Sequence, residues 1–134
     1  MDLTQKCSAL YAFTTDALTQ IAATGVDIWM VQVGNEINGG MAGEWSTNGR
    51  NQLMNAGSAA VRATLPDALV AVHFTNVSQS DAKKYIREVC EGDTPVDFDV
   101  MAYSYYSYWH GSLENLSELM ADCLLYTSPS PRDR

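Results

Sequence analysis

The chain of 134 residues has little positive charge. Eight Lys and Arg stand against 16 Asp and Glu, which gives a net charge of −8. Binding to nucleic acid requires clustered basic side chains that neutralise phosphates, so the composition argues against a nucleic-acid partner. No apolar run approaches the roughly 20 residues that span a bilayer, and we therefore expect no membrane partner. No Gly-x-Gly-x-x-Gly opens a helix, so the strongest sign of a nucleotide-binding fold is missing.

Cysteine and histidine are also scarce. Cys7, Cys90 and Cys123 form neither a metal-binding pattern nor a short-spaced disulfide framework. An odd number of widely spaced thiols indicates small buried hydrophobic residues. The two histidines lie far apart in the sequence, and the acids are scattered. Because these residues match no metal geometry, we expect no metal site and no cofactor.

The end of the chain differs from the rest. Segment 123–134 brings two prolines directly after a helical stretch that has no capping residue. It closely resembles the translation of a transposase adapter used in sequencing libraries, and such scars do not contribute to a fold. We therefore expect a catalytic-domain segment at 1–122, with the natural sequence stopping near Asp122, and a non-native tail at 123–134.

Helices and strands are predicted to alternate along the chain. Apolar residues at helical spacing predict helices at 3–24, 51–65, 80–91 and 113–121. Short apolar runs predict strands at 28–34, 69–74 and 98–104. This α/β order implies a parallel sheet with right-handed crossovers. A doubly wound sheet gives the same order, but polar residues after every strand favour part of a (β/α)8 barrel, which needs roughly 250 residues when complete.

Glu36 is the first candidate for chemistry, because it follows the apolar run that ends at Gly34. Retaining cleavage of a glycosidic bond needs two carboxyl groups about 5–5.5 Å apart. The acid must hold its proton near neutral pH, and the end of a buried strand is expected to desolvate Glu36 partly. The alternative is an ion pair with Arg50 or Arg62. Asn35 is expected to donate to a sugar 2-hydroxyl, or to be a turn residue.

A second group of candidates lies in the aromatic segment 103–111, after the third predicted strand. Flat aromatic faces suit the C–H faces of a pyranose and lose little rotamer entropy. Trp109 is the best candidate for stacking, and Tyr105 has the best hydroxyl for orienting a carboxylate. Tyr106 and Tyr108 are equally compatible with a place in the core. His110 is either a hydrogen-bonding partner of the substrate or a loop histidine.

His73 ends the second predicted strand. It is a candidate for binding substrate at the same edge of the sheet. A single histidine of this kind is more often a structural hydrogen-bonding group, and that alternative stays open.

Together these segments resemble glycoside hydrolase family 53, the arabinogalactan endo-β-1,4-galactanases. The resemblance rests on three segments, 30–41 with its Gly-Asn-Glu, Val-His-Phe at 72–74, and 96–111 with its Tyr-Trp-His-Gly. It implies a partial barrel of roughly strands four to six, with Glu36 as general acid/base and Asn35 as its 2-hydroxyl-binding neighbour. It places Tyr105 just before the strand-six substrate loop. It places Trp109 and His110 in that loop.

The resemblance also implies what the parent protein does. It implies a secreted or periplasmic, monomeric enzyme that hydrolyses galactan, with the nucleophilic glutamate on a strand outside this chain. The chain alone is then expected to be inactive. Residues 42–44 replace the family's usual Trp-Pro, and Trp45 is the residue that could substitute for the missing aromatic ring. Two alternatives remain: another glycosidase of the same superfamily, such as a mannanase or cellulase, and a non-catalytic carbohydrate-binding relative.

Overall fold

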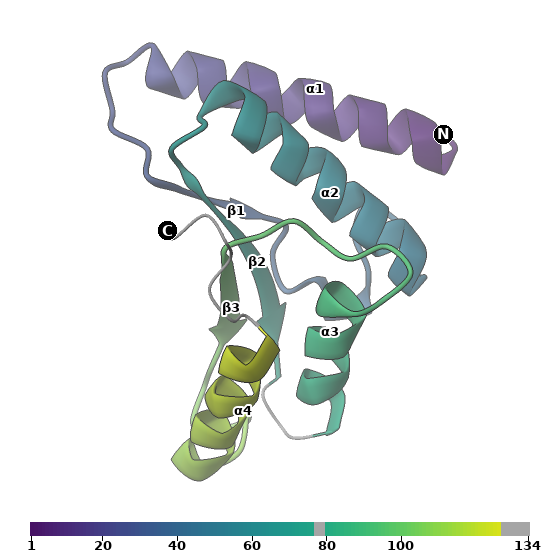
Figure 1. The fold of residues 1–134 in the computed structure, drawn as a ribbon, viewed down its shortest axis with the longest axis vertical. Coiled ribbons are helices and arrows are strands. Elements are labelled where there is room, and N and C mark those ends of the chain that lie inside the picture. The colour runs from purple at the N-terminus through teal and green to yellow at the C-terminus, as the bar shows by residue number, and fades with distance from the viewer. Residues whose placement is uncertain (77–79, 127–134) are drawn as a thin grey trace.

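The computed structural model describes residues 1–76 and 80–126 (Figure 1). Most of the predicted tail, residues 127–134, lies outside the described residues. In the described part, helices and strands alternate in the predicted order, and a one-turn 3-10 helix, η1 (Ile37–Gly39), is added after the first strand. The helices and strands are α1 (Leu3–Ala22), β1 (Met30–Val33), α2 (Thr47–Thr64), β2 (Leu69–Thr75), α3 (Ser80–Cys90), β3 (Val100–Ser104) and α4 (Leu113–Tyr126).

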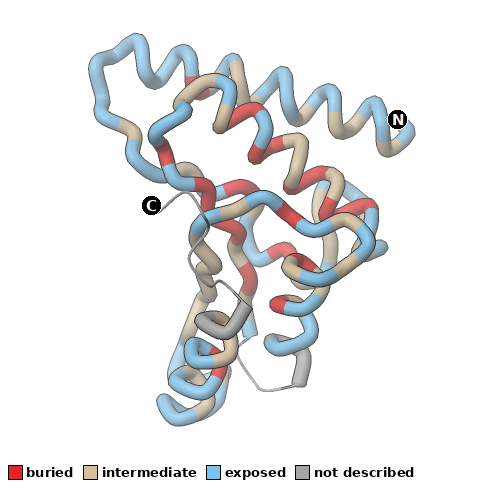
Figure 2. Tube along the Cα trace, viewed as in Figure 1, coloured by how far each residue is buried: buried red, intermediate tan, exposed pale blue. Residues whose placement is uncertain are grey.

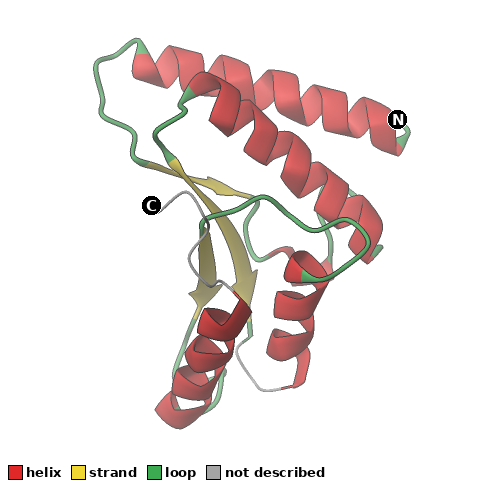
Figure 3. Ribbon diagram, viewed as in Figure 1, coloured by secondary structure: helices red, strands yellow, loops and turns green. Residues whose placement is uncertain are grey.

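The three strands form one parallel sheet with β2 in the centre (Figure 3). Val33 of β1 lies beside Val72 of β2, which in turn lies beside Met101 of β3. Parallel neighbours require a crossover, and α2 and α3 provide the two crossovers here. The sheet confirms the predicted topology.

One face of the sheet packs against the helices. Side chains alternate between the two faces of a strand, so Val70, Val72 and Phe74 share one face of β2. All three are fully buried, in clusters with Val61 and Met54 of α2 and with residues of α1 and α3. The buried positions in Figure 2 follow this layer between sheet and helices. The hydrophobic core is therefore the helix-facing side of the sheet.

The opposite face of the sheet carries the polar side chains of the strands. Gln32, His73 and Ser104 alternate with the helix-facing residues of β1, β2 and β3. Gln32 is exposed, and the other two are partly buried. These three polar residues, of which the sequence analysis named only His73, thus lie on one side of one sheet.

The close approach of α2 to β1 depends on a glycine. A Cβ atom at Gly57 of α2 would lie 2.5 Å from Cγ1 of Val33, which is closer than real Cβ contacts allow. The helix can therefore press against the last residue of β1 only because position 57 has no side chain. Val33 directly precedes the segment that carries Asn35 and Glu36.

Helix boundaries differ by more than two residues from the sequence prediction at two places. Helix α2 begins at Thr47 rather than 51, because Ser46 caps it: the Ser46 hydroxyl accepts a hydrogen bond from the Gly49 N–H at 3.1 Å. Helix α4 continues to Tyr126, beyond the predicted end at 121. The start of α4 has a capping box, since the side chains of Ser112 and Asn115 accept hydrogen bonds from each other's backbone N–H groups.

The cysteines described here are partly buried. Cys90 and Cys123 pack against Ile86 and Leu119, between α3 and α4. Burial raises the pKa of both thiols, to about 11 for Cys123, so both stay protonated at neutral pH. They act as small apolar side chains, as predicted, although neither is fully enclosed.

In the described residues, which form only three strands, the strand before Glu36 does not have the burial that was predicted. In the described residues β1 has a neighbour on one side only, and Met30 is 43% exposed while Gln32 is exposed as well. The Glu36 side chain is also exposed. The apolar run predicted burial on both faces, whereas only the face with Val31 and Val33 packs against helices.

Candidate active site

The carboxyl ends of the three strands bring together the segments that the sequence singled out. Gly34, Asn35 and Glu36 follow β1, His73 is near the end of β2, and Ser104 ends β3. The register places Thr75 beside Ser104 and His73 beside Ala102. Because the strands are parallel, all these residues lie at the same edge of the sheet.

Glu36 has an unusual backbone conformation. Its φ and ψ are both 48°, in the left-handed region that non-glycine residues rarely adopt. Gly34, two residues earlier, also has a positive φ of 79°. The chain therefore turns sharply as it leaves β1, and Glu36 becomes the residue that precedes η1.

The alternative role for Glu36, an ion pair with a nearby arginine, is not what the structure shows. Nη2 of Arg50 lies 2.6 Å from Oε2 of Glu88. Arg62 pairs with Asp97 and Asp99. Both arginines are therefore bound to other carboxylates.

His73 connects the three strand ends. Its Nδ1 accepts a hydrogen bond from the Glu36 backbone N–H at 3.0 Å, and its Nε2 lies 3.2 Å from Oγ of Ser104. An Nδ1 atom that accepts a bond carries no proton, so the neutral ring has its proton on Nε2 and donates it to Ser104. Both ring nitrogens thus have protein partners, which matches the structural role that the sequence left open.

The loop after β1 is fastened to β2 a second time, through Asn38. Its Nδ2 donates to the carbonyl oxygen of Thr75 at 2.8 Å, and its Oδ1 accepts from the Thr75 N–H at 2.7 Å. The amide thereby replaces a backbone partner for the end of β2. The loop is thus held at Glu36 by His73 and two residues later by the bonds of Asn38.

Asn35 is exposed, and its Oδ1 accepts a hydrogen bond of 3.3 Å from Nε2 of Gln32. The same Gln32 nitrogen donates to the carbonyl oxygen of Gly34 at 2.8 Å. Gln32 thereby holds the carbonyl oxygen of the Asn35 amide. The Nδ2 group is the donor that a sugar hydroxyl would need.

A tight hairpin follows η1 and carries Trp45. Met41 and Glu44 exchange two backbone hydrogen bonds of 2.9 Å, and the residues between them, Ala42 and Gly43, both have positive φ. Positive φ at both central positions is typical of a type I′ turn. Trp45 follows directly, and its side chain is 79% exposed. The hairpin thus presents an indole ring beside the Glu36 loop.

A second exposed indole follows β3. Trp109 is 73% exposed, and its ring contacts Tyr106 and Tyr108 edge-on, with centroids 6.4 and 5.3 Å away. Tyr106 and Tyr108 are themselves 55% and 88% exposed, so neither is a core residue. The three rings form an exposed aromatic cluster. They belong to the loop between β3 and α4, whose course is visible in Figure 1.

Tyr105 and His110 shape this loop from within. The Tyr105 hydroxyl donates its proton to the Gly111 carbonyl oxygen at 2.9 Å, so it is directed at the backbone rather than at a carboxylate. Nδ1 of His110 lies 3.0 Å from the Ser104 carbonyl oxygen and 3.2 Å from the Tyr106 nitrogen. A protonated Nδ1 bonds the first and an unprotonated one accepts from the second, so the tautomer selects one of the two bonds.

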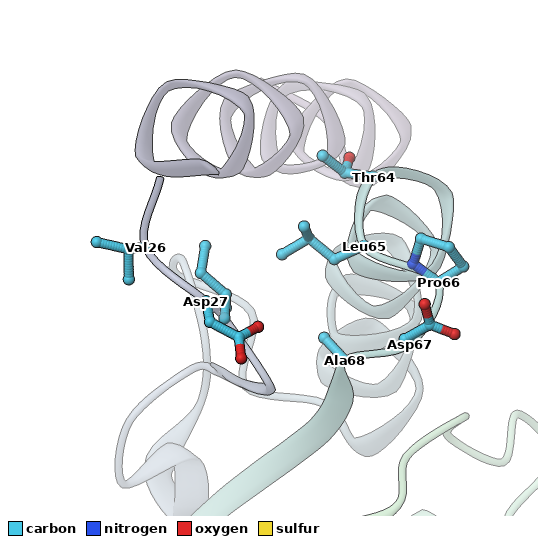
Figure 4. Close-up of a pocket in the computed structure, with 8 residues that line it drawn as sticks. Val26, Asp27, Thr64, Leu65, Pro66, Asp67 and Ala68 are labelled. Carbon is cyan, nitrogen blue, oxygen red and sulfur yellow. The ribbon is translucent and has the colours of Figure 1, made fainter. Parts of the chain in front are cut away.

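A pocket lies at the opposite end of the sheet (Figure 4). It has a volume of about 230 Å³ and is lined by segments 26–28 and 64–68, which precede β1 and β2. The amino-terminal ends of barrel strands are associated with stability rather than chemistry. This pocket is therefore separate from the Glu36 edge.

Two further features are absent from the described residues. No group of three or more His, Cys, Asp or Glu side chains within residues 1–76 and 80–126 is arranged to hold a metal ion. In the same part of the chain, none of the helices combines the length and the apolar character needed to cross a bilayer.

Sequence reasoning missed Gln32, Asn38 and Ser104 at this edge. Asn38 and Ser104 bond residues 37 and 31 positions away, and no local pattern shows such partners. A usable signal was present for Gln32, because it is the polar residue in an otherwise apolar strand.

Comparisons with known proteins agree on one family. The model of glycosyl hydrolase family 53 matches residues 1–126. An endo-beta-1,4-galactanase of Bacillus subtilis is 46% identical over 115 residues, which are 86% of this chain and 27% of that protein. A probable arabinogalactan endo-beta-1,4-galactanase A of Aspergillus fumigatus is 30% identical over 115 residues, with coverage of 77% of this chain and 32% of that protein.

Solved structures show the same relationship. The GH53 catalytic domain of Ignisphaera aggregans superposes with a TM-score of 0.80 at 28% identity, covering 93% of this chain and 35% of that one. A fungal beta-1,4-galactanase superposes with a TM-score of 0.85 at 20% identity, covering 93% of this chain and 41% of that one, a likeness of fold alone. The chain spans about a quarter to two fifths of the length of these proteins.

Proposed function

This chain belongs to glycosyl hydrolase family 53, and we propose that the longer parent protein containing it hydrolyses β-1,4-galactosidic bonds of galactan. Its fold is the predicted one, part of a (β/α)8 barrel. The observation that carries the proposal is the placement of Glu36. It is an exposed carboxylate at the carboxyl edge of a parallel sheet, where such barrels hold their chemistry.

In the proposed reaction Glu36 acts first as an acid. It donates its proton to the glycosidic oxygen while the C1–O bond breaks and a second carboxylate attacks C1 to form a glycosyl ester. In the second half, the Glu36 carboxylate takes a proton from water, and the water oxygen displaces the ester at C1. The configuration at C1 is retained, because it is inverted twice.

The second carboxylate is proposed to come from outside this chain. Glu44, in the same loop as Glu36, lies 2.6 Å from Nζ of Lys6. Asp97 and Asp99 precede β3, at the other end of the sheet, and bind Arg62. These carboxylates are engaged or at the wrong edge, so the chain by itself is proposed to be inactive.

The substrate is proposed to lie across the exposed indoles that border this edge. Trp109 lies on the loop after β3 and Trp45 follows the hairpin after β1, and these are the two strands that pair with β2. Galactose presents an apolar C–H face that suits an indole, and Asn35 can donate to its 2-hydroxyl. We propose that the parent acts outside the cytoplasm, because polymeric galactan does not cross a membrane.

The test is an assay of the purified parent protein on galactan, mannan and cellulose. Galactan is expected to be cleaved internally, and NMR of the first products should show the β-anomer. Cleavage of mannan or cellulose in preference to galactan would support the other superfamily glycosidases. Binding of galactan with no cleavage would support a carbohydrate-binding relative, and the chain of 134 residues assayed alone should release no oligosaccharides.

A further inference from the structure

We propose that His73 is a positioning residue, which holds the Glu36 backbone in its left-handed conformation and so sets the direction of the catalytic carboxyl group. This inference rests on the proposed role of Glu36 as acid/base. In this proposal His73 acts by positioning Glu36 and not by binding the sugar.

The first observation is that the Glu36 conformation needs support. A non-glycine residue at φ and ψ of 48° has its Cβ crowded against the backbone. Such a conformation persists where surrounding contacts fix it. The Glu36 side chain makes no capping hydrogen bond to η1, so the support acts on its backbone.

The second observation is the bond that provides this support. The Glu36 N–H points at Nδ1 of His73, with the two nitrogens 3.0 Å apart. That N–H can reach Nδ1 only while the peptide plane before Glu36 keeps its present orientation. The fixed peptide plane before Glu36, together with the Asn38–Thr75 bonds that hold the chain after it, restricts φ of Glu36, and the carboxyl group is carried on that Cα atom.

The third observation is that His73 is itself fixed. It lies on β2, the central strand, and its side chain is partly buried. Its Nε2 donates to Oγ of Ser104 on β3, which sets the ring orientation and keeps Nδ1 unprotonated. The chain of contacts Ser104–His73–Glu36 thus spans all three strand ends.

Two substitutions of His73 separate the two ring contacts. In His73→Asn the side-chain Oδ1 atom takes the place of Nδ1, so the acceptor for the Glu36 N–H is kept. In His73→Gln an amide nitrogen can reach Ser104 as Nε2 does, but no acceptor remains at the Nδ1 position. The two variants have similar polarity, and they differ in whether the side chain can accept the hydrogen bond of the Glu36 N–H.

Both variants are to be made in the full-length parent and assayed as kcat/KM on two substrates. Galactan has a poor leaving group that needs the proton of Glu36, whereas a dinitrophenyl β-galactobioside has an acidic leaving group that does not. A misplaced acid should therefore slow only the first reaction. A displacement of about 1 Å can lower a rate on the order of 10²-fold, and we expect a loss of that size for His73→Gln on galactan.

The expected result is a large loss for His73→Gln on galactan, a much smaller loss on the dinitrophenyl substrate, and near-normal activity of His73→Asn on both. Equal losses of His73→Gln on both substrates, together with a lower melting temperature, would show a purely structural role and overturn the proposal. Full activity of His73→Gln on galactan would overturn it as well.

Failure of the proposed function has a different signature. In that case the unmodified parent cleaves neither substrate, and crystal structures of the two variants decide the positioning role. A Glu36 that leaves the left-handed region in His73→Gln but not in His73→Asn supports it. A Glu36 with unchanged φ in His73→Gln refutes it.

Discussion

The side-chain amide of Asn38 makes both of its hydrogen bonds with one residue, Thr75, through the Thr75 carbonyl oxygen and N–H. This double contact fastens the loop that carries Glu36 to the end of the central strand. Asn55 makes the same kind of contact with Pro95 and Asp97, at the amino-terminal approach to β3. Asn38 and Asn55 thus each use a side-chain amide to bond one backbone carbonyl oxygen and one backbone N–H, and only Asn38 does so at the candidate site.

Replacement of Asn38 by Asp should reduce both stability and activity of the parent. The carboxylate keeps the bond to the Thr75 N–H but faces the Thr75 carbonyl oxygen without a donor. An unsatisfied buried acceptor costs about 1–3 kcal/mol. The control variant Asn55→Asp should lower the melting temperature less, since its bonds are exposed, and leave galactan turnover nearly unchanged, because Asn55 is remote from Glu36. Equal activity losses in the two variants would contradict a special role for Asn38.

Replacement of Glu36 by Gln should abolish most hydrolysis while binding persists. General acid catalysis typically contributes about 10²–10⁴-fold, and glutamine has no proton to give. Initial rates on galactan and calorimetric binding to oligosaccharides measure the two effects separately. Glu44→Gln is the control, since Glu44 lies in the same loop and pairs with Lys6. Near-parental turnover by Glu36→Gln would eliminate Glu36 as the acid.

Replacement of Trp109 by Ala should weaken oligosaccharide binding. The exposed ring loses its stacking face, and one large aromatic contributes roughly 1–3 kcal/mol when covered. The control is Phe13→Ala, because Phe13 is 71% exposed and lies on α1, away from the strand ends. Isothermal titration calorimetry measures the affinity of the Trp109→Ala and Phe13→Ala variants of the parent for oligosaccharides. Unchanged affinity with a large fall in melting temperature would make Trp109 a structural residue.

Replacement of Gly57 by Ala should push α2 away from β1. The new methyl group would lie 2.5 Å from the Val33 side chain, and overpacking of this kind costs about 1–3 kcal/mol. Shortening Val33 to Ala in the same protein should restore part of the lost stability. Urea unfolding of the single and double variants measures this coupling. Additive losses in the double variant would show that the two side chains do not compete for space.

Replacement of Glu88 by Gln should destabilise the parent through Arg50. The guanidinium is 3% exposed, stacks over Phe74 and Tyr85, and has Glu88 as its carboxylate partner. Removing one member of a buried ion pair costs about 3–5 kcal/mol. Because Glu88 is partly exposed, we expect a loss of stability near the lower end of that range. Lys84→Gln, which removes only an exposed partner of Glu88 at 3.8 Å, should cost less than about 1 kcal/mol in thermal unfolding.

Local pattern was enough to predict the order of the elements. Residues 69–74 are apolar except for His73, and β2 forms there. Ser112 and Asn115 are three positions apart, and their capping box depends only on that spacing. The position of Glu36 after β1 also follows from the sequence, because the end of a strand fixes which residues come next.

Local sequence pattern did not predict correctly which side chains are buried, because burial depends on the elements that pack against them. Phe13 fits the helical spacing of α1, yet it is 71% exposed, and Leu18 is the buried residue of that helix. The run 28–34 predicted a buried strand, whereas β1 is an edge strand in the described sheet. Periodicity reports which residues share a face, and it carries no information on whether another element lies against that face.

The sequence by itself determined that a carboxylate and an aromatic loop follow two strands of a parallel sheet. Only the tertiary structure decided that His73 accepts a hydrogen bond from the Glu36 N–H and that the Asn38 amide bonds the backbone of Thr75. Both contacts join residues 37 positions apart. Their geometry is set by the register between β1 and β2, and that register results from how Val33 and Val72 pack together under α2 rather than from any short stretch of the chain.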